Sequence, residues 1–258
     1  MPIAAGIYYF LFEGGGTRKP SLVLIHGAGG DHLSWPPEIR RLAYARTFTL
    51  DLPGHGKSKG PGRQSVAEYS KNVIGFLDSA GISRAVIIGH SLGGAIALDL
   101  CSKNPDRVAG IGLISSGVLM PIPRPVMDNA ANPATFNQAV QSFQELMHIS
   151  PGAHQLRIQT FKRLSSLRQA LFLGDLQACD QYDGSEQLGI IRCPVLVVCG
   201  TNDHLTPLRY SQNLARSIPG AALQTIDGGG HLVILEQPRR VAGLIDIFLK
   251  SIPTSFEI

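Results

Sequence analysis

The pattern Gly-x-Ser-x-Gly at residues 89–93 constrains this chain more than any other feature of its sequence. It follows the apolar run 84–88, which is typical of a buried strand, and it leads into 92–103, where apolar residues recur at helical spacing. A serine between a strand and a helix lies on a turn so sharp that flanking side chains would collide, which explains a glycine on either side. The pattern therefore predicts a nucleophile elbow that lifts the Ser91 hydroxyl to the rim of a sheet, at the carboxyl ends of its strands.

Apolar runs and helical patterns alternate along the rest of the chain. Such alternation predicts a doubly wound, mostly parallel sheet covered by helices on both faces. Sites in sheets of this kind lie beyond the carboxyl ends of the strands. We expect strands at 7–12, 21–25, 48–50, 84–88, 111–115, 194–199 and 222–226, and helices at 65–80, 92–103, 208–218 and 238–251.

One long segment, residues 117–189, interrupts this alternation. It shows no convincing strand, it contains every methionine except the initiator, and its Phe and Leu residues recur at roughly helical spacing. It is too long for a simple connection between two elements. We therefore expect a catalytic core formed by residues 1–116 and 190–258, with residues 117–189 as a helical cap inserted after the sixth strand.

Charge and composition exclude several classes of protein. Only 16% of the 258 residues are charged and the formal net charge is +4, with basic residues scattered in nothing longer than pairs. A nucleic-acid binder concentrates its basic residues in a patch, so nucleic acid is not an expected partner. Residues 1–12 are too short for a membrane span and lack the basic start of a secretory signal. The four cysteines have no metal-ligand spacing, so we expect buried free thiols and a cytoplasmic protein.

The chain resembles the α/β-hydrolase superfamily, in particular its small capped serine esterases of carboxylesterase type. The resemblance covers nearly the whole chain and is strong at the motifs but weak across 117–189. It implies a mostly parallel, twisted sheet of about eight strands flanked by helices, and a helical cap after the sixth strand. The motifs that carry it are the segments 26–29, 51–58, 89–93, 200–207 and 230–232.

A serine hydroxyl is a weak nucleophile until a base takes its proton, and a histidine base needs an acid to orient it. The superfamily order is Ser, then Asp or Glu, then His, which Ser91, Asp203 and His231 follow. Asp203 and His231 each come after an expected strand, so both fall at the carboxyl edge with Ser91. Asp227 is an alternative acid, although it lies at the end of a strand.

Two backbone N–H groups must bind the oxyanion that forms during ester attack. Leu92 supplies one as the residue after the nucleophile, and the resemblance implies Ala28 as the second. We interpret His26 as a structural residue of the oxyanion loop. The apolar residues Trp35, Met120, Met127, Phe143 and Met147 are candidates for the substrate pocket. The alternative for the cap residues is packing inside the cap, and for Trp35 packing against a helix that it opens.

Together these features predict a serine hydrolase that cleaves small, fairly apolar carboxylic esters through an acyl-enzyme. No metal or organic cofactor is expected, and the protein is expected to be a monomer or small homo-oligomer. The serine argues against dehalogenase and epoxide-hydrolase chemistry, which use aspartate at the elbow. Lactonase, thioesterase, carbon–carbon hydrolase and perhydrolase activities fit the same triad. A small-ligand receptor or stress-signalling relative with little turnover is the alternative from another class, and multiple turnover of an ester would distinguish the two.

Overall fold

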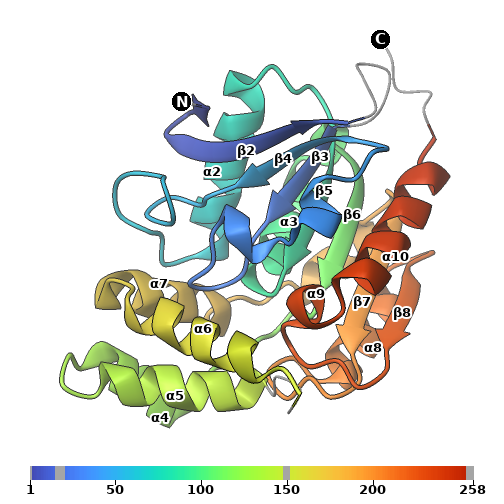
Figure 1. Ribbon diagram of the computed structural model, residues 1–258. Coiled ribbons are helices and arrows are strands. Elements are labelled where there is room, and N and C mark those ends of the chain that lie inside the picture. The colour runs from blue at the N-terminus through green and yellow to red at the C-terminus, as the bar shows by residue number, and fades with distance from the viewer. Residues whose placement is uncertain (1, 15–20, 148–151, 254–258) are drawn as a thin grey trace.

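A single eight-stranded sheet runs through the middle of the computed structural model, which describes residues 2–14, 21–147 and 152–253 (Figure 1). The strand order is β1-β2-β4-β3-β5-β6-β7-β8. In this order, each strand from β4 through β3 and β5 to β8 is parallel to the next, whereas β2 is antiparallel to both β1 and β4. The expected mostly parallel sheet is thus confirmed. The strands are β1 (Ile3–Ala4), β2 (Ile7–Glu13), β3 (Ser21–Ile25), β4 (Arg46–Leu50), β5 (Ala85–His90), β6 (Val108–Ile114), β7 (Val195–Gly200) and β8 (Ala222–Ile226).

Helices cover both faces of this sheet and create two apolar cores. On one face, α2 (Val66–Ser79), α3 (Leu92–Lys103) and α8 (Leu208–Ser217) contribute to the larger core. On the other face, α1 (Pro37–Arg40) and α10 (Pro238–Ser251) contribute to the smaller one. Every residue of β5, β6 and β7 is buried, which explains why these strands are continuous apolar runs rather than alternating ones.

In the described part of the chain, four α-helices stand between β6 and β7. They are α4 (Arg124–Ala131), α5 (Phe136–Met147), α6 (His154–Ser165) and α7 (Gln169–Asp180), and we call residues 124–180 the insert. Figure 1 shows them stacked at the end of the sheet toward which the central strands point. Phe172 of α7 packs edge-on against Phe136 and Phe143 of α5, so these aromatic rings tie the insert together. The division into core and cap stays a prediction, and residues 148–151 lie outside the described part of the chain.

Short elements complete the connections: the 3-10 helices η1 (His32–Ser34), η2 (Pro105–Arg107) and η3 (Ser185–Ile190), and the helix α9 (Val233–Glu236). Trp35 was expected to open a helix, but it lies between η1 and α1 with extended backbone angles. The cause is local, because Pro36 follows it and a residue before proline is pushed out of the helical region. Among the described residues, no helix has the length and apolar character needed to cross a membrane.

Candidate active site

The turn between β5 and α3 holds Ser91 in a strained backbone conformation. Its φ of 55° and ψ of −119° are rarely adopted by a residue with a side chain. A Cβ on Gly89 would strike the backbone of Gly93, and a Cβ on Gly93 would strike the carbonyl of Ile25 in β3. The two glycines that flank the serine are thus required by close backbone packing. The Ser91 N–H also donates to the Ile114 carbonyl at 2.9 Å, which fixes the turn against β6.

Asp203 and His231 meet at the same edge of the sheet, although 28 positions separate them. Asp203 lies after β7 and His231 after β8, and both side chains are buried. Nδ1 of His231 lies 2.9 Å from Oδ2 of Asp203. The hydroxyl of Thr206 donates to the same Oδ2 at 2.7 Å and lies 3.2 Å from His231 Nδ1. The carboxylate therefore fixes the tautomer with the proton on Nδ1, which leaves Nε2 with a lone pair.

Burial opposes the negative charge on Asp203, yet the surrounding groups stabilise it more strongly. His231 and the hydrogen bonds from Thr206 lower the pKa of the Asp203 carboxyl below its ordinary value. Asp203 is consequently a carboxylate at neutral pH, and it can stabilise an imidazolium at His231. This is the arrangement that a histidine general base requires.

Two neighbours hold the backbone of His231, and sequence reasoning missed both of these contacts. Nε2 of His90 donates to the His231 carbonyl at 2.8 Å, and the His231 N–H donates to the Met147 carbonyl at 2.8 Å. Burial, together with the nearby His231, lowers the pKa of His90 to about 3, so His90 is a neutral donor. Since Met147 ends α5, the insert itself helps to position His231. A histidine beside the nucleophile was the only sequence signal for the first contact.

Ser91 and His231 line one cavity between the sheet edge and the insert. In the described part of the chain, the Ser91 hydroxyl takes part in no hydrogen bond. The cavity is mostly apolar. The other residues that line it are Gly27, Ala28, Gly29, Gly30, Ser34, His90, Phe143, Met147, Thr160, Arg163, Leu164, Leu232, Ile234 and Leu235.

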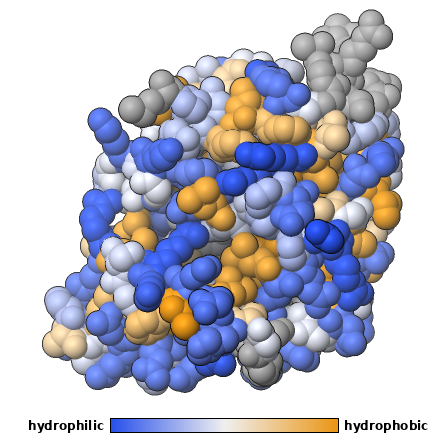
Figure 2. Space-filling model, viewed as in Figure 1, coloured by the Kyte–Doolittle hydropathy of each residue, from blue (hydrophilic) through white to orange (hydrophobic). Residues whose placement is uncertain are grey.

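A second, smaller cavity also reaches Ser91 and shares Phe143 with the first. It is lined further by Met120, Pro121, Ile122, Cys179, Leu205 and Thr206. Of the five sequence candidates for the pocket, Phe143, Met147 and Met120 thus line the two cavities at Ser91. In the space-filling view, apolar atoms gather near the middle of the face between the insert and the α9–α10 segment (Figure 2).

The structure corrects the expectation for Trp35 and Met127, which line neither of these two cavities. Trp35 is fully buried in the smaller core, where Ile39 and Leu42 also lie, on the face away from the insert. Met127 is partly buried and packs against the larger core from α4. Both were candidates because of their apolar side chains, and the sequence could not show which surface each side chain would cover.

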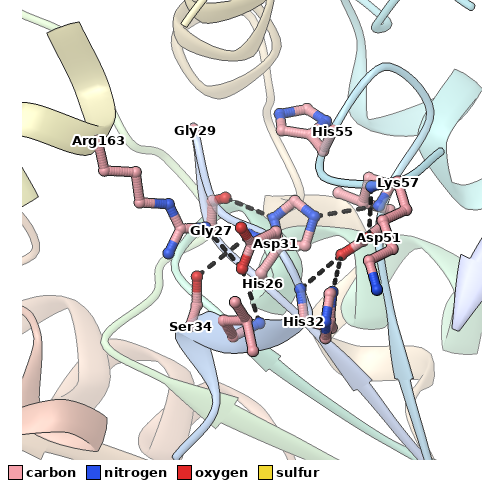
Figure 3. A network of polar contacts seen from close by, with 12 residues as sticks. His26, Gly27, Gly29, Asp31, His32, Ser34, Asp51, His55, Lys57 and Arg163 are labelled. Carbon is pink, nitrogen blue, oxygen red and sulfur yellow. Dashed lines mark hydrogen bonds and ion pairs between the residues drawn. The ribbon is translucent and has the colours of Figure 1, made fainter. Parts of the chain in front are cut away.

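Ala28, in the loop after β3, lines the larger cavity. Figure 3 shows its neighbours Gly27 and Gly29 in this loop. His26, fully buried, anchors the loop: its Nδ1 donates to the Gly27 carbonyl at 2.8 Å and its Nε2 accepts from the Leu52 N–H at 3.0 Å. Burial and the neighbouring His55 keep the pKa of His26 well below its ordinary value, so it stays neutral. Among the hydrogen bonds of the described residues, neither the Ala28 nor the Leu92 N–H donates to a protein acceptor.

Asp31, His32 and Asp51 form a further polar cluster beside this loop (Figure 3). Oδ1 of Asp51 accepts from the His32 N–H at 2.6 Å and from His32 Nδ1 at 2.8 Å, and Oδ2 accepts from the Lys57 N–H at 2.8 Å. Oδ1 of Asp31 lies 3.0 Å from Nη2 of Arg163 in α6. One ligand-type atom from each residue lies within 4.8 Å of the others, but Asp51 already binds N–H donors on both oxygens. The cluster therefore serves as an anchor between loops.

Comparisons with known proteins agree with this architecture. Residues 20–238 match the family model described as the α/β hydrolase fold, so the chain belongs to that family. It is 34% identical to the dihydrolipoyllysine-residue acetyltransferase component of the acetoin cleaving system of Pseudomonas putida, over 93% of this chain. The chain spans only 66% of the length of that relative.

Two further matches are proteins of similar length. The chain is 26% identical to a putative carbamate hydrolase RutD of Caulobacter sp. (strain K31), with 95% of this chain and 96% of the relative covered. The crystal structure of a hydrolase from Pseudomonas aeruginosa PA01 superposes with a TM-score of 0.83 at 25% identity, covering 95% of this chain and 94% of the other. The family is thus one with hydrolase members.

Proposed function

We propose that this protein is a serine hydrolase of carboxylesterase type that cleaves small, mostly apolar carboxylic esters. The observation that carries this proposal is the meeting of Ser91, on its strained turn, with His231 at one cavity, while Asp203 lies 2.9 Å from the far nitrogen of His231. A nucleophile, a base and an orienting acid are the parts that acyl transfer needs. The carbamate hydrolase and hydrolase names of the relatives support the same reaction class.

In this proposal, Ser91 attacks the ester carbonyl while Nε2 of His231 takes the hydroxyl proton. Asp203 stabilises the imidazolium that results, and His231 then gives the proton to the leaving alcohol. The free N–H groups of Ala28 and Leu92 bind the oxyanion of the tetrahedral intermediate. Water, deprotonated by the same imidazole, hydrolyses the acyl-enzyme and regenerates Ser91.

The two cavities that meet at Ser91 support an ester with an apolar group on each side of the carbonyl. One cavity would take the acyl part and the other the alcohol part, with Phe143 at the boundary between them. Their walls consist largely of apolar side chains, and Met adapts to varied apolar shapes. In this proposal, the insert acts as the cap that closes over the bound ester, as the contribution of α5 and α6 to the cavity wall suggests.

A panel of p-nitrophenyl esters, from acetate to palmitate, tests the proposal. We expect multiple turnovers with a preference for short acyl chains, and a loss of about 10⁴-fold or more in kcat on Ser91→Ala. A fluorophosphonate should label the wild-type protein at Ser91 and should not label the variant. Ser102→Ala on α3, a serine whose hydroxyl donates to the Asp99 carbonyl, is the matched control and should keep wild-type kcat.

Persistent hydrolysis by a pure Ser91→Ala sample would overturn the assignment of the nucleophile. A single stoichiometric burst without further turnover would instead favour the receptor alternative. A marked preference for the longest acyl chains would contradict the small-ester specificity while leaving the reaction class intact.

A further inference from the structure

A fully buried carboxylate on the insert joins three separate segments of the sheet-bearing part of the molecule. Oδ2 of Asp175, in α7, accepts the Gly29 N–H at 2.8 Å and lies 2.8 Å from Nε2 of His55. Oδ1 accepts the Tyr69 hydroxyl at 2.6 Å. We call these four residues the Asp175 cluster. Gly29 follows Ala28 in the loop after β3, His55 follows β4, and Tyr69 lies in α2, so α7 is bonded to all three.

The geometry also favours the charged form of His55. Nδ1 of His55 lies 3.1 Å from the Pro53 carbonyl, which can only accept, and Nε2 faces the Asp175 carboxylate. Both contacts are satisfied when His55 donates through each ring nitrogen, so the two acceptors favour the imidazolium form of His55. The ionisable groups facing His55 are Asp175, Tyr69, Asp51 and His26, whose ring lies 4.8 Å away. Burial opposes the charge on His55, but Asp175 outweighs it and raises the pKa of His55.

This cluster acts on the peptide group that follows the proposed oxyanion donor. The Ala28 N–H shares a peptide plane with the Gly27 carbonyl, which His26 Nδ1 and the Gly30 N–H hold at 2.8 and 3.0 Å. The next peptide plane, between Ala28 and Gly29, is held by Asp175 through the Gly29 N–H. Gly29 has a φ of 64°, so the chain turns here in a conformation that residues with a side chain rarely adopt. Figure 3 shows Gly29 and His55 at the same edge of the loop network.

We propose that Asp175 is a positioning residue, through which helix α7 of the insert holds the Ala28–Gly29 peptide and so keeps the Ala28 N–H aimed at the oxyanion. This inference rests on the proposed function, since it concerns the oxyanion site of that same reaction. The oxyanion hole is then complete only while α7 of the insert is packed against the loop after β3. Asp175 touches neither substrate nor nucleophile, so its effect reaches the reaction through Gly29 and Ala28.

The imidazolium of His55 makes this arrangement sensitive to alkaline pH. A histidine whose folded pKa is raised contributes stability that is complete below its unfolded value of about 6.5. That contribution is lost as pH rises through the folded pKa. Above that pH, His55 can donate through only one nitrogen, and Asp175 loses the charge that it pairs with. We therefore expect an alkaline decline of kcat in the wild-type protein.

Asp175→Asn is the test, with Asp180→Asn as its matched control. Asp180 lies on the same helix, but its Oδ1 accepts from the Ile122 N–H at 2.9 Å, in the segment leading to α4 and away from the oxyanion loop. For a short p-nitrophenyl ester, we expect Asp175→Asn to lower kcat by about 10- to 100-fold while KM stays within about 3-fold. Labelling of Ser91 by a fluorophosphonate, whose phosphoryl oxygen occupies the same site, should slow in parallel. The alkaline decline should move to lower pH.

Asp180→Asn should keep wild-type values in each of these measurements. Equal losses of kcat in the two variants, or a rise in KM with kcat unchanged, would overturn the proposal, because a general loss of insert stability explains either. If Asp175→Asn does not fold, Tyr69→Phe decides. This variant removes the bond to Oδ1 and keeps the ion pair, so kcat should fall by about 3- to 10-fold with KM kept.

An unchanged kcat and pH profile in Tyr69→Phe would then count decisively against the proposal. Labelling of wild-type Ser91 separates a failure of the proposed function from a failure of the positioning role of Asp175. If wild-type Ser91 is neither labelled nor active, the proposed function fails and this inference fails with it. If wild-type Ser91 is labelled and Asp175→Asn is labelled equally fast, only the positioning role fails.

Discussion

Asp203 shows how a single side chain is held in this protein, because each of its carboxylate oxygens has two hydrogen-bond partners. Oδ1 accepts from the N–H groups of Leu205 and Thr206, and Oδ2 from Thr206 Oγ1 and His231 Nδ1. These bonds favour the charged form, so the carboxylate stabilises the fold at neutral pH. Because its pKa is lowered, that contribution is lost only when the pH falls below the ordinary carboxyl range.

Asp203→Asn tests this residue as the acid of the triad. The amide is neutral and cannot stabilise an imidazolium, so kcat for a short ester should fall by about 10³- to 10⁴-fold. Asp227→Asn is the matched control, since Asp227 is the other acid that the sequence offers near His231. Its Oδ1 lies 3.4 Å from the Thr201 hydroxyl, and its loss should leave kcat within about 2-fold. A larger loss in Asp227→Asn than in Asp203→Asn would reverse the assignment.

At the scale of elements, the close contact of α3 with β3 decides where the nucleophile stands. Sequence patterns predicted α3 and α10 with their observed bounds, and they placed most strands within a few residues, because apolar periodicity is a local property. The glycines of the elbow were predicted from the sharpness of the turn. The structure adds that Gly93 is also needed by a separate element, since its Cα faces the carbonyl of Ile25.

Gly93→Ala tests the close contact between α3 and β3, and Gly243→Ala is its matched control. A methyl group on Gly93 meets backbone that cannot move without displacing α3, so we expect a loss of about 1–3 kcal/mol in the free energy of unfolding. Gly243 lies within α10 with open space around its Cα, so alanine there should add about 0.5–1 kcal/mol. Urea unfolding of both variants measures the difference. Equal stability of the two would show that the contact at Ile25 relaxes without cost.

At the scale of the whole molecule, two cysteines from distant parts of the chain lie side by side between α3 and the start of β7. All four cysteines are free thiols, and Sγ of Cys101 lies 3.4 Å from Sγ of Cys193. Cys101 belongs to α3 and Cys193 precedes β7, so the insert lies within the chain segment between them. The sequence predicted free thiols but not this proximity, because 92 positions separate the pair.

Mild oxidation with hydrogen peroxide should therefore link Cys101 to Cys193, the two thiols losing their hydrogens as peroxide becomes water. A cross-link that closes so long a segment restricts the unfolded chain, and Tm should rise by about 5–15 °C. Peptide mapping identifies the bond, and Cys193→Ser, treated in the same way, should show no rise. Cys179→Ser should behave as wild type, because the buried Cys179 has no such neighbour among the described residues. Oxidation that leaves Tm unchanged would contradict this expectation.

The sequence by itself determined the sheet-and-helix order, the elbow at Ser91 and the chain order of Ser91, Asp203 and His231. These follow from local physics: apolar periodicity sets the elements, and steric crowding at a sharp turn demands glycine. Tertiary structure alone decided that Phe143 and Met147 line the cavity while Met127 packs elsewhere, and that His90 and Asp175 hold the loops of the site. Such contacts join residues more than 100 positions apart. They depend on strand order and on how the insert docks, which no spacing along one chain records.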